Sequence, residues 1–115
     1  MTDKLPAAYI TEDEAGRALE WLLKNGQAIA DAKRRTVLAE RSIKRVMAIA
    51  MKQSNEKSAA AQERDALAGS SYEAAIQEEA DAAAGYELLR HYKDTAFARL
   101  DAWRTMESTR RSLAK

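Results

Sequence analysis

Apolar residues recur along the first half of the chain at alternating steps of three and four. This heptad spacing is typical of a long helix that buries one narrow apolar seam. Thr11 and Glu14 have the spacing of a capping box, which predicts where the helix starts. The pattern therefore predicts a helix over 12–55. Its two seam series are Ala15, Leu22, Ile29, Thr36, Ile43 and Ala50, and Ala18, Asn25, Ala32, Ala39, Val46 and Gln53.

A second periodic segment predicts another long helix over 70–112. Gly69 precedes it, and Ser70 with Glu73 repeats the capping-box spacing. Between the two helices, 56–69 is expected to form a turn with a short helix. Residues 1–10 form an N-terminal arm, and the whole chain, 1–115, is expected to be one domain. The seam of the second helix is predicted at Tyr72, Ala75 or Ile76, Ala82 or Ala83, Tyr86, Leu89, Ala96 or Phe97, Leu100 and Trp103.

Charge alternates in blocks along the chain. Residues 12–31 carry five acidic and two basic residues, whereas 33–57 carry two acidic and eight basic residues. Residues 63–87 carry seven acidic and one basic residue, and 90–115 carry three acidic and seven basic residues. Folding the chain back near residue 63 sets opposite charges against each other at both ends, with Trp21 opposite Trp103. The sequence predicts an all-α, coiled-coil-like antiparallel helical hairpin.

Several apolar side chains lie outside the narrow seam and would remain uncovered in a single hairpin. Two helices alone bury only one stripe each, so these residues predict that a second copy packs against the hairpin. The expected assembly is a homo-oligomer, a dimeric or higher helical bundle. The residues concerned are Leu19, Leu23, Val37, Leu38 and Met51.

Composition argues against an enzyme. There is no cysteine, which excludes disulfides, thiolate metal sites and a cysteine nucleophile. The single histidine, His91, lies off the seam, and no H-E-x-x-H, glycine-rich phosphate loop or G-x-S-x-G occurs. Glu78, Glu79 and Asp81 are interpreted as partners of the basic stretch in preference to a divalent metal site. We expect a non-catalytic protein with no metal and no cofactor.

Nothing in the sequence suggests export or a membrane. The first ten residues, MTDKLPAAYI, lack the basic segment and long apolar run of a secretory signal. The longest apolar run, 46–51, is far too short to cross a bilayer. The expected location is the cytoplasm.

The most concentrated charge is the stretch KRRTVLAERSIKR, 33–45, with six basic residues and one acidic residue. Lys33, Arg35 and Lys44 lie near the seam and are expected to pair with the carboxylates at 78, 79 and 81. The three other bases of the stretch, together with one lysine beyond its end, point away from the seam over ~27 Å of helix, and we call these four the outer stripe. The outer stripe is either a site for an external anion or an ordinary solvated helix face. Its members are Arg34, Arg41, Arg45 and Lys52.

A second basic candidate is the C-terminal segment RLDAWRTMESTRRSLAK. Arg104, Arg110 and Arg111 stand there among serine, threonine and a tryptophan. Such residues are typical of phosphate contacts and base stacking. The alternative is a basic helix end that suits its own dipole.

The chain also resembles a group of small helical proteins encoded by tailed bacteriophages and prophages, over roughly 12–112 and most clearly from 56 onward. The shared features are a K-S-x-x-x-x-E-R-like turn, a tyrosine that opens the next helix, an A-W-R-T-like segment and two further arginines. The matching residues are Lys57, Ser58, Glu63, Arg64, Tyr72, Ala102, Trp103, Arg104, Thr105, Arg110 and Arg111.

The resemblance implies phage origin and expression inside a bacterial host. Genes of this group tend to lie among recombination and replication genes. The expected function is that of a DNA-metabolism accessory that binds nucleic acid or a recombination protein through a basic helix face. The alternative is an anti-defence, anti-CRISPR-like inhibitor that binds a host effector protein.

Overall fold

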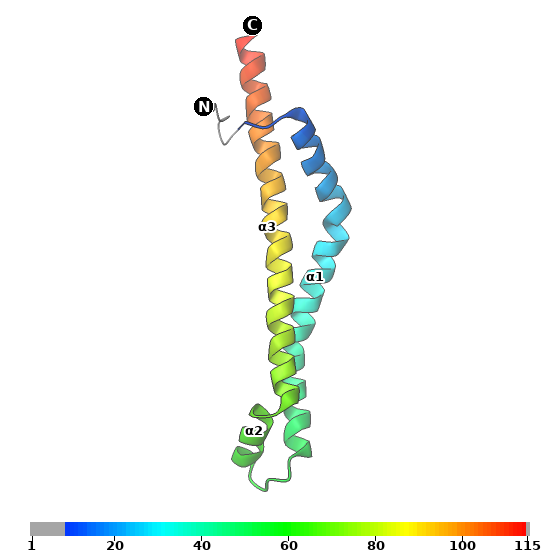
Figure 1. The fold of residues 1–115 in the computed structure, drawn as a ribbon, viewed down its shortest axis with the longest axis vertical. Helices are drawn as coiled ribbons and strands as arrows, with labels where there is room; N and C mark the ends of the chain where they lie inside the picture. The colour runs from blue at the N-terminus through cyan, green and yellow to red at the C-terminus, as the bar shows by residue number, and fades with distance from the viewer. Residues whose placement is uncertain (1–8, 115) are drawn as a thin grey trace, which may run out of the picture. The chain divides into compact units, whose positions relative to one another are not determined.

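The computed structural model describes residues 9–114, and helices account for nearly all of these residues (Figure 1). The elements are α1 (Glu12–Gln53), α2 (Ala59–Leu67) and α3 (Ser70–Leu113). No strand occurs within the described residues. The all-α helical hairpin predicted from the heptad pattern is confirmed.

The predicted capping box begins α1. The backbone N–H of Glu14 donates to Thr11 Oγ1 over 3.1 Å, and the N–H of Thr11 donates to Glu14 Oε1 over 3.5 Å. Each side chain thus satisfies a backbone donor that the first helical turn leaves unpaired. The acidic first turn, Glu12 to Glu14, adds a favourable interaction with the positive end of the helix dipole.

Helix α3 begins at Ser70, as predicted, but the capping box suggested by Ser70 and Glu73 does not form. Within the described residues, no side-chain hydrogen bond joins Ser70 to Glu73; instead the N–H of Glu73 donates to the carbonyl of Gly69 over 3.2 Å. Ser70 is thus already inside the helix and cannot serve as its N-cap. A serine cap occurs earlier, at α2, where the Ser58 hydroxyl accepts from the N–H of Ala61 over 3.1 Å.

The chain forms two compact units, each built from antiparallel segments of α1 and α3. The turn unit comprises Ile29–Leu88 and includes α2. The terminal unit comprises Met1–Ala28 and Leu89–Lys115. In the terminal unit, the N–H of Ile10 lies 3.2 Å from Met106 Sδ, so the start of α1 lies beside the last third of α3.

The seam predicted for α1 is the face that the helix buries. Its members are buried or half-buried, apart from Gln53, which is exposed. The predicted seam of α3 left a choice between neighbouring residues at several positions. Ala75 is half-buried, and Ala82 and Ala96 are buried, whereas the alternatives Ile76 and Phe97 are exposed. Two charged residues, Glu79 and Lys93, occupy half-buried positions of the same seam.

The register between the helices differs from the one predicted. Folding at residue 63 would bring Trp21 to Trp103, but its ring lies 6.1 Å from that of Tyr92, eleven residues earlier. The chain reverses closer to the end of α1. Asp65 and Ala66 of α2 line a pocket with Ala50 of α1, and Ser70 lines the same pocket, so α3 begins beside the last turn of α1.

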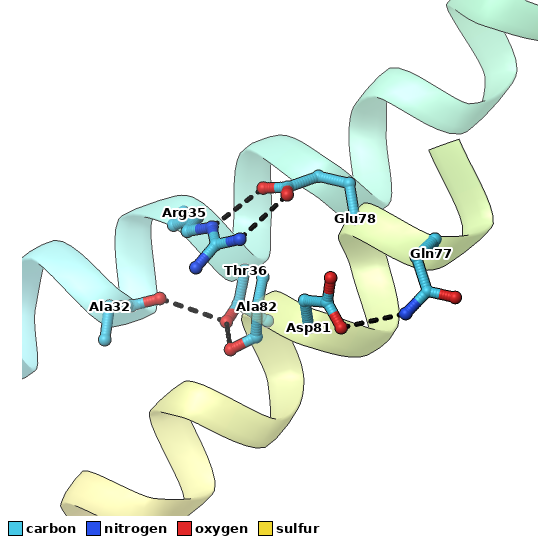
Figure 2. A network of polar contacts seen from close by, with 7 residues as sticks. All are labelled: Ala32, Arg35, Thr36, Gln77, Glu78, Asp81 and Ala82. Carbon is cyan, nitrogen blue, oxygen red and sulfur yellow. Dashed lines mark hydrogen bonds and ion pairs between the residues drawn. The ribbon is translucent and has the colours of Figure 1, made fainter. Parts of the chain in front are cut away.

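The packed interior is made almost wholly of small side chains. The buried apolar residues are Ile10, Ala15, Ala18, Ala39, Ala66, Ala82 and Ala96. Alanine at the contact allows two helices to approach closely. The Thr36 hydroxyl, buried at this contact, lies 3.0 Å from the carbonyl of Ala32 on its own helix and 3.3 Å from that of Ala82 on α3 (Figure 2).

Candidate nucleic-acid interface

The outer stripe lies on α1 within the turn unit, and all four of its side chains are exposed. Arg34 makes an ion pair with Asp31, one turn earlier on the same helix. Within residues 9–114, Arg41, Arg45 and Lys52 make no ion pair. Three cations on one exposed helix face therefore have their full charge available to an external anion.

Of the bases nearer the seam, Arg35 behaves as predicted. Its Nε and Nη2 donate to the two carboxylate oxygens of Glu78, each over 2.8 Å (Figure 2). This bidentate geometry is the strongest form of a charged hydrogen bond between side chains. These two hydrogen bonds lower the pKa of the Glu78 carboxyl below its ordinary value. They also raise the pKa of the Arg35 guanidinium.

The other two seam-side bases depart from the prediction. The Lys33 ammonium lies 5.2 Å from the ring centroid of Tyr86, a cation–π contact in place of the expected ion pair. Lys44 is exposed and makes no ion pair within the described part of the chain. Asp81 accepts a hydrogen bond from Gln77 over 2.9 Å, and it lies close enough to contribute to the raised pKa of Arg35 (Figure 2). One base of the three is neutralised by α3, and Lys44 adds a further cation beside the outer stripe.

The C-terminal candidates lie in the terminal unit and are mostly paired along their own helix. Arg104 lies 3.5 Å from Asp101, and Arg110 lies 2.9 Å from Glu107. Arg111 is exposed and has no ion pair within residues 9–114. Ion pairs at a spacing of three residues stabilise a helix by only ~0.2–0.5 kcal/mol, so a phosphate can replace the carboxylate at little cost.

A cleft of about 610 Å³ in the terminal unit was not predicted; we call it the aromatic cleft. Its walls come from the first part of α1 and the middle of α3. The sequence signal for it is weak, because its members from the two helices meet only in the observed register. From the sequence, Trp21 was expected opposite Trp103, and His91 was placed off the seam. The lining residues are Glu14, Arg17, Ala18, Trp21, His91, Tyr92, Thr95, Ala96 and Arg99.

The described residues show no further chemical centre. No three histidine, cysteine or acidic side chains come together between residues 9 and 114 in a way that would hold a metal ion. Over the same range, no helix combines the length and apolar character needed to cross a bilayer.

Comparisons with protein-family models, with curated proteins and with solved structures found no match to this chain.

Proposed function

We propose that the protein is a non-catalytic accessory of phage DNA recombination or replication that binds nucleic acid through the outer stripe. The observation that carries this proposal is that the acidic side chains of α3 neutralise only part of the basic charge on α1. The carboxylate of Glu78 engages Arg35, while Arg41, Arg45 and Lys52 make no ion pair within residues 9–114. The proposed place of action is the cytoplasm of a bacterial host.

The spacing of the outer stripe suits a phosphate backbone. Arg41 and Arg45 are one helical turn apart, ~6 Å along α1, and the stripe as a whole extends over ~27 Å. Arginine and lysine side chains that track phosphates position a protein on nucleic acid without reading base edges. We therefore expect the affinity to depend strongly on salt concentration and only slightly on nucleotide sequence.

The salt dependence of affinity tests the proposal. Each phosphate contact releases condensed counterions, so log affinity falls linearly with log salt, with a slope of ~0.7 per contact on single strands and ~0.9 on duplex. Arg41→Ala with Arg45→Ala is expected to flatten this slope by about two contacts' worth. Helix content should be retained, since both side chains are exposed and alanine favours helix.

The matched control is Lys24→Ala with Arg64→Ala, which removes the same charge from exposed positions outside the stripe. Fluorescence anisotropy with a labelled oligonucleotide, repeated over a salt series, measures all three proteins. An equal slope in the wild type and the Arg41/Arg45 variant would remove the outer stripe from nucleic-acid binding. Arg104, Arg110 and Arg111 would then be the next candidates.

A second candidate function is inhibition of a host defence effector by protein–protein contact. The observation that favours it is a cleft of about 540 Å³ in the turn unit, where Leu38 is 58% exposed beside Arg34 and Arg35. An exposed leucine among charged residues suits a protein surface better than a phosphate backbone. If this candidate is correct, the Arg41/Arg45 variant should bind oligonucleotide as weakly as the wild type does.

We also infer that a second copy of the chain packs against the hairpin. Among the described residues no large side chain is fully buried, and Leu19, Leu23 and Phe97 in the terminal unit are 49%, 78% and 51% exposed. A chain of this size ordinarily buries a large apolar core, and a self-associated pair supplies the missing cover.

Sedimentation tests this assembly. The protein is expected to sediment as a dimer or larger species at micromolar concentration, at no less than twice its chain mass of 12.8 kDa. Leu23→Lys should shift the equilibrium toward monomer, because it places a charge at the most exposed of the three apolar positions named above. A 12.8 kDa species throughout the micromolar range would contradict the inference.

A further inference from the structure

The aromatic cleft combines three rings from the two long helices of the terminal unit. The rings of Trp21 and Tyr92 lie 6.1 Å apart at 67°, an edge-to-face contact that fixes both side chains. The ring of His91 lies 6.0 Å from that of Tyr92 at 54°. Tyr92 is nevertheless 47% exposed and Trp21 only half-buried, so both rings are held by the fold while part of each faces solvent.

Two arginines line the same cleft, one from each helix. Arg99 is exposed and makes no ion pair within the described residues. Arg17 pairs with Asp13 over 3.1 Å, but both side chains are mostly exposed, at 68% and 80%, so a stronger anion can displace this partner. The one acidic residue of the lining, Glu14, is engaged in the capping box with Thr11.

We propose that the aromatic cleft stacks the bases of single-stranded nucleic acid on Tyr92 and Trp21, with the adjoining phosphates on Arg17 and Arg99. Aromatic faces next to arginine are the elements with which proteins hold single strands, because every base offers a π-face whatever its sequence. A duplex keeps its bases stacked internally and offers this cleft only phosphates. The inference rests on the proposed function and adds to it the form of nucleic acid that is bound.

The test uses Trp103→Phe, which leaves Trp21 as the only tryptophan of the chain. The full-length variant is titrated with a thymidine homopolymer of about 15 nucleotides and with an abasic oligonucleotide of equal length. The two probes carry the same phosphates, and only the first carries bases. We expect tighter binding of the thymidine probe, together with quenching of Trp21 fluorescence that the abasic probe does not produce.

Two substitutions in this background separate stacking from charge. Tyr92→Ala should weaken binding of the thymidine probe about 5- to 150-fold, the range for loss of a base-stacking side chain, without changing binding of the abasic probe. Arg99→Ala should weaken binding of both probes by the same factor, because it removes a phosphate contact. Tyr92→Phe, which keeps the ring, should bind as the parent does.

Tyr9→Ala is the matched control, since Tyr9 is an exposed aromatic residue of the terminal unit that does not line the cleft. It should leave the affinity for both probes unchanged, and circular dichroism should show equal helix content in all variants. Equal affinity for the two probes with constant Trp21 fluorescence would overturn the stacking inference and leave the outer stripe in place. Failure of both probes to bind at low salt would overturn the proposed function, and the inference with it.

Discussion

Exchanging both Arg41 and Arg45 for glutamate is expected to weaken binding of a single-stranded oligonucleotide by about 100-fold or more at low ionic strength. A hydrogen bond to a charged group contributes about 1.5–3 kcal/mol, and the exchange removes two such contacts. It also sets two negative charges against the phosphates. The loss should shrink as salt rises, since screening weakens both the lost attraction and the new repulsion.

Lys24→Glu with Arg64→Glu is the control, because it changes the net charge by the same amount at exposed positions outside the outer stripe. This control should lose far less affinity than the Arg41/Arg45 exchange. Similar losses in the two proteins would mean that net charge, and not the stripe, governs binding. Filter binding or anisotropy at a fixed low salt concentration is sufficient for the comparison.

Replacing Ala82 by leucine is expected to lower the free energy of unfolding by about 3 kcal/mol, at the upper end of the usual cost of overpacking a buried site. Ala82 is only 2% exposed, and its carbonyl lies 3.3 Å from the Thr36 hydroxyl across the helix contact. A larger side chain forces the two helices apart and disrupts that hydrogen bond. Leucine and alanine have nearly equal helix propensity, so the helix itself is unaffected.

Ala84→Leu provides the matched control, two residues further along α3 at an exposed position. Thermal or urea unfolding followed by circular dichroism should show a clear loss of stability for Ala82→Leu and almost none for Ala84→Leu. Equal stability of the two variants would mean that α1 and α3 do not meet closely at Thr36 and Ala82.

The helices and their buried faces follow directly from the sequence. Apolar residues at heptad spacing leave one face of α1 able to be buried, and residues as far apart as Ala15 and Ala50 obey the same rule. The capping box at Thr11 and Glu14 is equally local, since four neighbouring residues contain all its donors and acceptors. Features that depend only on the chain's immediate neighbourhood are therefore predictable from the chain.

The register between the helices was not predictable in the same way. Alternating blocks of charge are about twenty to twenty-five residues long, so they select an antiparallel arrangement but tolerate a shift of eleven residues, about three helical turns. Alanine seams are also permissive, because one small side chain packs much like another at each heptad step. The predicted partner of Trp21 was wrong for this reason.

The two candidate sites also differ in how far the sequence could predict them. Exposure of Arg41 and Arg45 depends on their helix face alone, and the heptad pattern indicated it from sequence. The aromatic cleft depends on Trp21 meeting Tyr92 and on Arg17 lying near Arg99, so it exists only in the observed register. The contact of Lys33 with the ring of Tyr86, in place of an ion pair with a carboxylate, depends on the same register.

The most direct test of the account is a ¹⁵N NMR titration of the wild-type protein with a single-stranded oligonucleotide, observing the backbone amides and the arginine Nε–H groups. We expect the Nε–H signals of Arg41 and Arg45, and the amides around Lys52, to shift most and to return as salt is added. The acidic first turn, Glu12 to Glu14, should change little. Unchanged Arg41 and Arg45 signals at an oligonucleotide concentration that shifts other residues would contradict the central claim.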